Sequence, residues 1–139
     1  MSVAVETRLD TAIEAATTRL LELQHADGYW VGELESNVTM TAQHLFWHHV
    51  LGLRTPELDR KIANELLARQ RDDGTWAIWF EGPGDLSTTI EAYWALRLAG
   101  DDPAEEHMKI AAEFIREQGG IAAARVFTHL WLSLFGLWS

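Results

Sequence analysis

The sequence predicts an all-α fold, and three observations support this. Apolar residues recur at helical spacing along the chain, and no stretch shows the sustained alternation of a strand. A heptamer, Q-x-x-D-G-x-W, occurs at residues 24–30 and again at 70–76, which is 46 positions later. Gly and Pro signals divide the chain into segments of helical length. We therefore expect three helix hairpins with a repeat of roughly 46 residues.

The repeat extends beyond the heptamer. A degraded third copy, QGG at residues 118–120, lies 48 positions after the second and has lost its Trp. The segments in front also agree, since residues 61–70 read KIANELLARQ and residues 109–118 read KIAAEFIREQ. We expect a single domain over residues 1–139, with repeat units at about 9–52, 53–100 and 101–139.

In the first half of the chain, caps and turns give the expected helix boundaries. Residues 10–24 have helical apolar spacing, and Asp27-Gly28 ends that helix because Gly adopts positive φ freely. Ser36 or Asn37 is a suitable N-cap for a second helix that runs to about residue 51. A third helix is expected to begin near Pro56 and to reach residue 70.

The second half continues the pattern. After the loop at residues 81–85, we expect Ser87 or Thr88 to cap a helix that runs through residue 98. Asp102-Pro103 is expected to open the next helix, which ends at residue 118. Residues 121–134 are expected to form the last helix.

We interpret each heptamer as a clasp, meaning side chains that tie a helix end to the turn after it. The Gln can bond backbone groups that the helix end leaves unpaired, and the Trp can cover the turn. A sugar- or cation-binding aromatic site is the alternative. The residues assigned to the structural repeat are Gln24, Gly28, Trp30, Gln70, Gly74, Trp76 and Gln118.

Composition excludes several classes of function. The 21 acidic and 11 basic residues give a net charge of −10, which argues against a nucleic-acid surface. Cysteine is absent, so disulfides, thiolate zinc sites and thiol nucleophiles are excluded. The start of the sequence lacks a signal-peptide pattern, and no apolar run is long enough to span a membrane. We expect a cytoplasmic protein.

Candidate chemistry rests on polar residues in helices that are otherwise apolar. Thr39, Gln43, Glu91 and Arg125 all fit that description. A buried Glu91 needs a partner, for which Arg125 is the natural candidate; separate surface charges are the alternative. His44 and His48 lie four residues apart, but position 45 is Leu, so the H-E-x-x-H pattern is absent. We expect no metal and no cofactor.

Several segments together resemble the amino-terminal part of bacterial squalene-hopene cyclases, which are class II triterpene cyclases. Besides the heptamers, these are LESNVTM at 34–40, DLSTTIEAY at 85–93, and QGGI with RVFT between 118 and 128. The similarity covers residues 9–139. It implies part of an α/α toroid, in an enzyme that cyclises squalene to hopene or hopanol through carbocations. It also implies peripheral membrane attachment, and a homodimer is left open.

The resemblance implies a site as well as a fold. By motif match, Thr39, Gln43, Glu91, Arg125 and Trp131 would form the polar network that holds water where the final cation loses a proton. Gln43 departs from the Glu that is familiar in relatives. The D-x-D-D acid that starts the reaction is absent, since position 70 is Gln and position 99 is Ala.

This chain alone is therefore expected to be inactive, and its apolar end leads us to expect more protein after Ser139. Two alternatives remain. One is a class II cyclase that acts on another polyprenoid. The other is a helical-repeat interaction module without catalysis.

Overall fold

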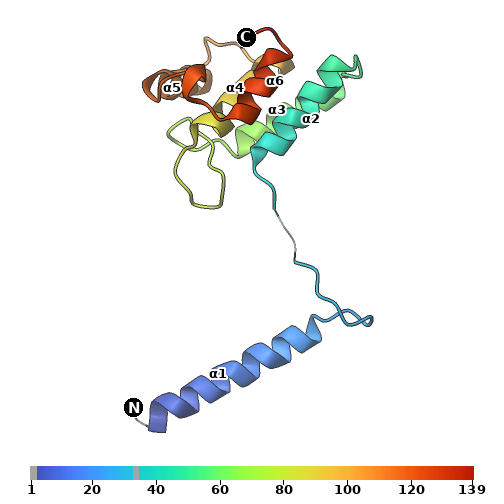
Figure 1. The fold of residues 1–139 in the computed structure, drawn as a ribbon, viewed down its shortest axis with the longest axis vertical. Coiled ribbons are helices and arrows are strands. Elements are labelled where there is room, and N and C mark those ends of the chain that lie inside the picture. The colour runs from blue at the N-terminus through green and yellow to red at the C-terminus, as the bar shows by residue number, and fades with distance from the viewer. Residues whose placement is uncertain (1–2, 33–34) are drawn as a thin grey trace. The chain divides into compact units, whose positions relative to one another are not determined.

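The computed structural model describes residues 3–32 and 35–139 and shows an all-helical chain (Figure 1). Within those ranges there is no strand, and the sole extended pairing is an isolated bridge between Ala77 and Gly84. The expected all-α helical-repeat fold is confirmed. The helices are α1 (Val3–Glu22), α2 (Val38–Val50), α3 (Pro56–Ala68), α4 (Leu86–Ala99), α5 (Glu106–Glu117), the 3₁₀ helix η1 (Ile121–Ala123) and α6 (Val126–Ser133).

The chain divides into two compact units, Met1–Glu35 and Ser36–Ser139. The first unit carries α1 and the first heptamer. The second carries the remaining helices and the second heptamer. The repeat boundaries at about 9–52, 53–100 and 101–139 stay a prediction.

Helix α4 is central to the unit Ser36–Ser139 because it contacts α2, α3, α5 and α6. Its residues from 87 to 92 are all buried, which explains why its sequence shows no polar face. The core around it consists mainly of large apolar side chains that are almost fully buried: Leu45, Phe46, Leu66, Trp76, Leu96 and Met108. A polar residue on α4 is therefore placed inside the unit by the fold itself.

Several helix starts follow the sequence prediction. Asn37 caps α2 by accepting a hydrogen bond from the backbone N–H of Thr39. Thr55 caps α3, with Pro56 in its first turn. The prediction for α4 was wrong, because Asp85 caps this helix and accepts from the backbone N–H of Thr88 at 2.8 Å. The Asp85 carboxylate also accepts a hydrogen bond from the Thr88 hydroxyl, so Thr88 supports the capping interaction but is not the N-cap residue.

Three other boundaries differ from expectation. Helix α1 begins at Val3 rather than at residue 10. Helix α5 begins at Glu106, because the Asp102 carboxylate accepts from the N–H of Ala104 and forms a turn before the helix. The expected helix at 121–134 is broken, since Arg125 is extended (ψ 155°) and its N–H donates to the Ser87 hydroxyl at 2.9 Å.

The two heptamers make the same local hydrogen bonds. Each Gln donates its Nε2–H to the carbonyl of the Gly four residues later, at 2.7 Å in the first copy and 2.9 Å in the second. Each Trp donates its indole N–H to a carbonyl ten residues earlier, Leu20 at 2.6 Å and Leu66 at 2.8 Å. Gly28 and Gly74 have φ of +87° and +73°, which suits glycine.

The two copies differ in what covers them. Trp76 is 1% exposed, whereas Trp30 is 50% exposed. Gln70 makes an additional bond to the His107 carbonyl at the start of α5, and a Cβ on Gly74 would lie 2.5 Å from Ile110 of that helix. In the third copy, Gln118 is exposed, and among the described residues its side chain has no hydrogen-bond partner.

Candidate functional site

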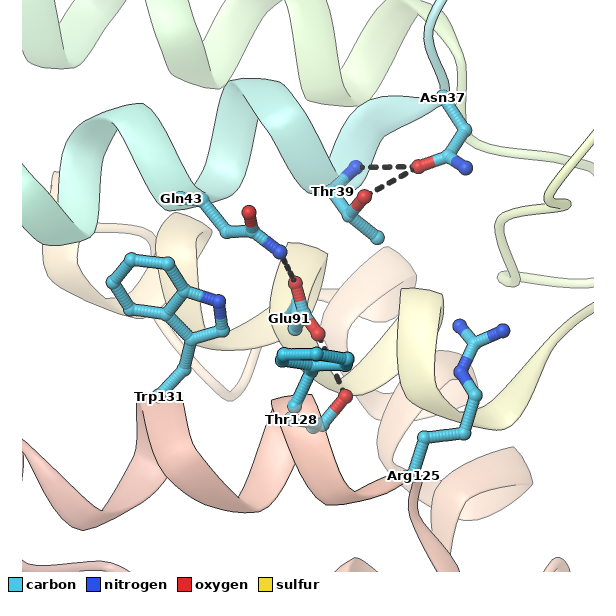
Figure 2. A pocket seen from close by; sticks show the side chains of 8 residues that line it. Asn37, Thr39, Gln43, Glu91, Arg125, Thr128 and Trp131 are labelled. Atoms are coloured by element: carbon cyan, nitrogen blue, oxygen red, sulfur yellow. Dashed lines mark hydrogen bonds between the residues drawn. The ribbon is translucent and has the colours of Figure 1, made fainter.

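An open pocket of about 560 Å³ lies in the unit Ser36–Ser139, where α2, α4 and α6 meet. Figure 2 shows its side chains converging from those three helices and their N-terminal ends. We call it the Glu91 pocket, and its lining residues are Asn37, Thr39, Gln43, Glu91, Arg125, Phe127, Thr128 and Trp131. All five residues proposed for the polar network line this pocket.

Glu91 is the most deeply placed charged group of the pocket. It lies on α4 and is 3% exposed, because α4 is surrounded by other helices. Gln43 of α2 donates its Nε2–H to Oε2 of Glu91 at 2.8 Å (Figure 2). Thr128 of α6 donates its hydroxyl to Oε1 at 2.6 Å. Each carboxylate oxygen thus accepts one hydrogen bond from a different helix.

Burial raises the pKa of Glu91 above its ordinary value. The hydrogen bonds from Thr128 and Gln43 and the positive charge of Arg125 oppose that shift, whereas the negative charge of Asp85 adds to it. A carboxylate with a raised pKa binds a proton more readily than an exposed one. Glu91 is therefore better suited to accept a proton than an exposed carboxylate would be.

The expected pairing of Glu91 with Arg125 was wrong. Arg125 pairs with Asp85 at 2.8 Å and also approaches the Thr88 hydroxyl at 3.4 Å. The break before α6 brings Arg125 to the N-terminus of α4, where Asp85 is the cap. Glu91 lies six residues further along α4, which is about 9 Å of helix rise. The guanidinium thus lines the pocket beside Glu91 without bonding to it.

Thr39 and Trp131 shape the pocket rather than bond to Glu91. The Thr39 hydroxyl donates to the Asn37 side chain at 2.6 Å, so it is engaged at the α2 cap (Figure 2). Trp131 is half-buried and packs against Phe46 and Trp47 of α2, with ring centroids 5.8 and 5.4 Å away. Its ring forms an aromatic wall next to the carboxylate.

Sequence reasoning missed Asn37, Phe127 and Thr128 as pocket residues, and it missed Asp85 as the partner of Arg125. A signal for Thr128 was available. It is a polar residue inside an apolar helix, which is the same criterion that selected Thr39 and Gln43. Phe127, which is 71% exposed, offered no such signal because exposure is not visible in the sequence.

The other candidate, the pair His44 and His48, lies on α2 with ring centroids 4.4 Å apart. In the part of the chain that the structure describes, no group of three or more His, Cys, Asp or Glu side chains is arranged to hold a metal ion. Among the same residues, no helix is both long and apolar enough to cross a bilayer.

The arrangement of the pocket supports proton acceptance in a partly apolar environment. One buried carboxylate accepts from two neutral donors, an aromatic wall lies beside it, and the pocket is open. Comparison with known families gives this geometry a context. Residues 13–139 match the family described as squalene-hopene cyclase N-terminal domain. The chain belongs to this family.

Several curated relatives of the squalene-hopene cyclase domain are similar over nearly the whole chain. A squalene–hopene cyclase of Alicyclobacillus acidocaldarius is 48% identical over 128 residues, which cover 92% of this chain and 20% of the relative. A squalene–hopene cyclase of Zymomonas mobilis is 41% identical over 132 residues, which cover 94% of this chain and 20% of the relative. A dammaradiene synthase of Dryopteris crassirhizoma is 37% identical over 128 residues, covering 92% and 19%. The chain spans about a fifth of the length of these relatives.

Proposed function

We propose that this chain is the amino-terminal part of a squalene–hopene cyclase, which converts squalene to hopene or hopanol by proton-initiated carbocation cyclisation. The family match supports the reaction class, and the relatives that carry this name support the substrate. The observation that carries the role of this segment is the Glu91 pocket. A buried carboxylate beside aromatic side chains is what the last step of such a reaction requires.

In that last step, a carbon next to the final cation loses a proton, and the C–H electron pair forms the double bond of hopene. Alternatively, water adds to the cation and then loses a proton, which gives hopanol. Both routes need a proton acceptor near an ordered water, while bulk solvent is kept away from the cation. We assign the acceptor role to Glu91 and the aromatic wall to Trp131.

The other pocket residues position these groups. Gln43 orients Oε2 of Glu91 through its amide, and it does so as a neutral group. Arg125, held by Asp85, brings positive charge near the carboxylate without neutralising it directly. Thr39 lines the pocket at the start of α2 and completes its polar side.

The first step must be catalysed elsewhere. An alkene is a weak base, so protonating it takes a strong, preorganised acid. The D-x-D-D sequence that the family resemblance assigns to this step does not occur in these 139 residues. We infer that this chain alone does not cyclise squalene and that it requires the rest of a cyclase.

A second candidate is a class II cyclase that forms a different product from a polyprenoid. The 37% identity to a protein named dammaradiene synthase favours keeping it. The difference between the two would lie in how the final cation is quenched, which is the step assigned to the Glu91 pocket.

We also propose that the whole cyclase works in the cytoplasm, attached to the membrane surface. Squalene is a hydrocarbon with negligible solubility in water, so an enzyme that takes it up must draw it from a lipid phase. Flotation of the full-length enzyme with lipid vesicles tests this attachment. A cyclase that remains in the soluble fraction with squalene-loaded vesicles would contradict it.

The proposed role of Glu91 is tested in the full-length cyclase that carries this segment. Glu91→Gln keeps the shape of the side chain and removes its basicity, so we expect loss of product or a changed ratio of hopene to hopanol. Glu117→Gln on α5 is the matched control, because Glu117 is exposed and lies outside the pocket. Gas chromatography of products from squalene measures both variants. Equal product profiles for wild type and Glu91→Gln would contradict the proposal.

A further inference from the structure

We propose that Thr128 is a positioning residue that makes Oε1 the oxygen of Glu91 which receives the proton. This inference rests on the proposed role of Glu91 as the terminal proton acceptor. It concerns a residue that lies in the RVFT segment of the family resemblance but was not assigned to the polar network.

The geometry begins with the burial of Thr128. Its side chain lies on α6 and is 1% exposed, although it contributes to the pocket wall. The hydroxyl donates to Oε1 of Glu91 at 2.6 Å, and Figure 2 shows it beneath the carboxylate, opposite Gln43. A short bond between two buried side chains leaves little freedom for either group.

The two donors on Glu91 differ in chemistry. The Gln43 amide nitrogen can only donate, whereas the Thr128 hydroxyl can donate or accept. If a proton is added at Oε2, the new O–H and the Gln43 N–H are two donors that face each other. The Gln43 amide would have to rotate by half a turn to present its oxygen instead. If it is added at Oε1, the Thr128 hydroxyl rotates about its C–O bond and accepts from the new O–H. Protonation at Oε1 therefore leaves every hydrogen bond in place with the smallest rearrangement.

The proton balance of the step is simple. The C–H bond next to the cation breaks, its electron pair forms the C=C bond, and the proton passes through water to Oε1. The carboxylate becomes a neutral carboxylic acid, and Thr128 changes from donor to acceptor. Release of that proton to bulk water restores the starting state.

The charged groups around Glu91 do not replace this function of Thr128. Arg125, at the start of α6, lowers the pKa of Glu91, and Asp85, at the start of α4, raises it. These two groups pair with each other. From α2, Glu91 is contacted by Gln43, which is neutral. Thr128 is thus a neutral partner that remains hydrogen-bonded in both protonation states of Glu91.

The test measures the proton affinity of Glu91 in this chain, where no cyclisation is needed. Thr128→Val is close in shape and lacks the hydroxyl, and Thr128→Ser retains the hydroxyl. Carbon-13 NMR of the Glu carboxyl carbons over a pH titration, with Glu91 assigned by its loss in Glu91→Gln, gives the pKa of Glu91. The bond from the Thr128 hydroxyl to the charged carboxylate is stronger than its bond with the neutral acid, so its loss in Thr128→Val should make Glu91 bind its proton about tenfold more tightly.

The Ser variant should return the pKa of Glu91 to the wild-type value. If Thr128→Val leaves that pKa unchanged, or if Thr128→Ser raises it as much as Val does, the proposal is overturned. Thr128→Ala replaces the Val variant if Val prevents folding. The product assay on Glu91→Gln tests the role of Glu91 as proton acceptor independently of this titration. The results therefore distinguish that proposal from the one about Thr128.

Discussion

The second heptamer and the Glu91 pocket both place polar side chains inside the unit Ser36–Ser139. The two regions differ in the groups with which these side chains form hydrogen bonds. Gln70 donates to the backbone carbonyls of Gly74 and His107. Trp76 donates to the backbone carbonyl of Leu66. Glu91 instead receives its hydrogen bonds from other side chains, which come from α2 and α6. The carboxylate lines the Glu91 pocket, and the heptamer residues are not part of that lining.

We interpret this difference as one between a structural region and the region proposed to carry chemistry. Backbone carbonyls are fixed by the helices, so the heptamer bonds mainly stabilise the fold. A carboxylate buried in an apolar helix costs free energy that a Leu at that position would not cost. We therefore expect substitutions in the heptamer to reduce stability, and substitution of Glu91 to change chemistry with little loss of stability.

The two regions also differ in the sign of their pH dependence. For Asp73 of the second heptamer, burial tends to raise the pKa, but hydrogen bonds from Thr75 and the charge of Arg71 outweigh it and lower the pKa below 3.8. Asp73 thus stabilises the fold above that value and loses its contribution as pH falls through its lowered pKa. Glu91, whose pKa is raised above 4.5, has the opposite sign. Its folded state holds a proton that the unfolded state releases, so stability decreases as pH rises from 4.5 through the raised pKa.

Trp76→Ala should have the largest effect on stability. Its side chain is 1% exposed and belongs to the core, so truncation leaves a cavity and an unpaired Leu66 carbonyl. We expect a loss of about 3–5 kcal/mol in the free energy of unfolding, measured by urea denaturation with circular dichroism. Trp30→Ala, at the half-exposed equivalent, is the matched control and should cost much less. Equal losses would show that burial by neighbouring helices does not decide the contribution of the heptamer.

Gly74→Ala should have the next largest effect. A Cβ there would lie 2.5 Å from Cγ2 and 2.8 Å from Cβ of Ile110, in addition to the strain of φ +73°. Left-handed strain costs about 1 kcal/mol and overpacking about 1–3 kcal/mol more. Gly28→Ala carries the strain alone, since the nearest atom to its Cβ would be Gln24 Nε2 at 4.0 Å. Thermal unfolding measures both variants, and a larger loss of stability in Gly28→Ala would contradict the role of Ile110 packing at the second heptamer.

The sequence predicted the helices well and selected five side chains that line one pocket, for physical reasons. Apolar spacing of about 3.6 residues and Pro or Gly punctuation are local signals, and they identified the six α-helices of residues 3–32 and 35–139. The polar residues of apolar helices α2 and α4 led to Gln43 and Glu91, because the helices around α4 bury Glu91 and bring the half-buried Gln43 against it. The family resemblance added Trp131, which carries no local signal.

What the sequence did not predict depends on competition and on three-dimensional spacing. Asp85 caps α4 in place of Ser87 or Thr88. All three are suitable N-cap residue types, and the backbone conformation at the start of the helix decides which of them caps it. The partner of Arg125 depends on where the chain breaks before α6, and that break depends on a bond to Ser87 on another helix. The partner of Glu91 on α6 is therefore Thr128 rather than Arg125.

The most direct test of the central claim, that Glu91 is retained for chemistry and not for stability, is the free energy of unfolding of Glu91→Gln across pH. Urea denaturation of this chain and of the variant, from below pH 4.5 to neutral pH, measures it. We expect the variant to be at least as stable as wild type at neutral pH and to lack the decrease that wild type shows as pH rises above 4.5. A variant that is less stable by several kcal/mol at every pH would contradict it, since Glu91 would then be a structural residue.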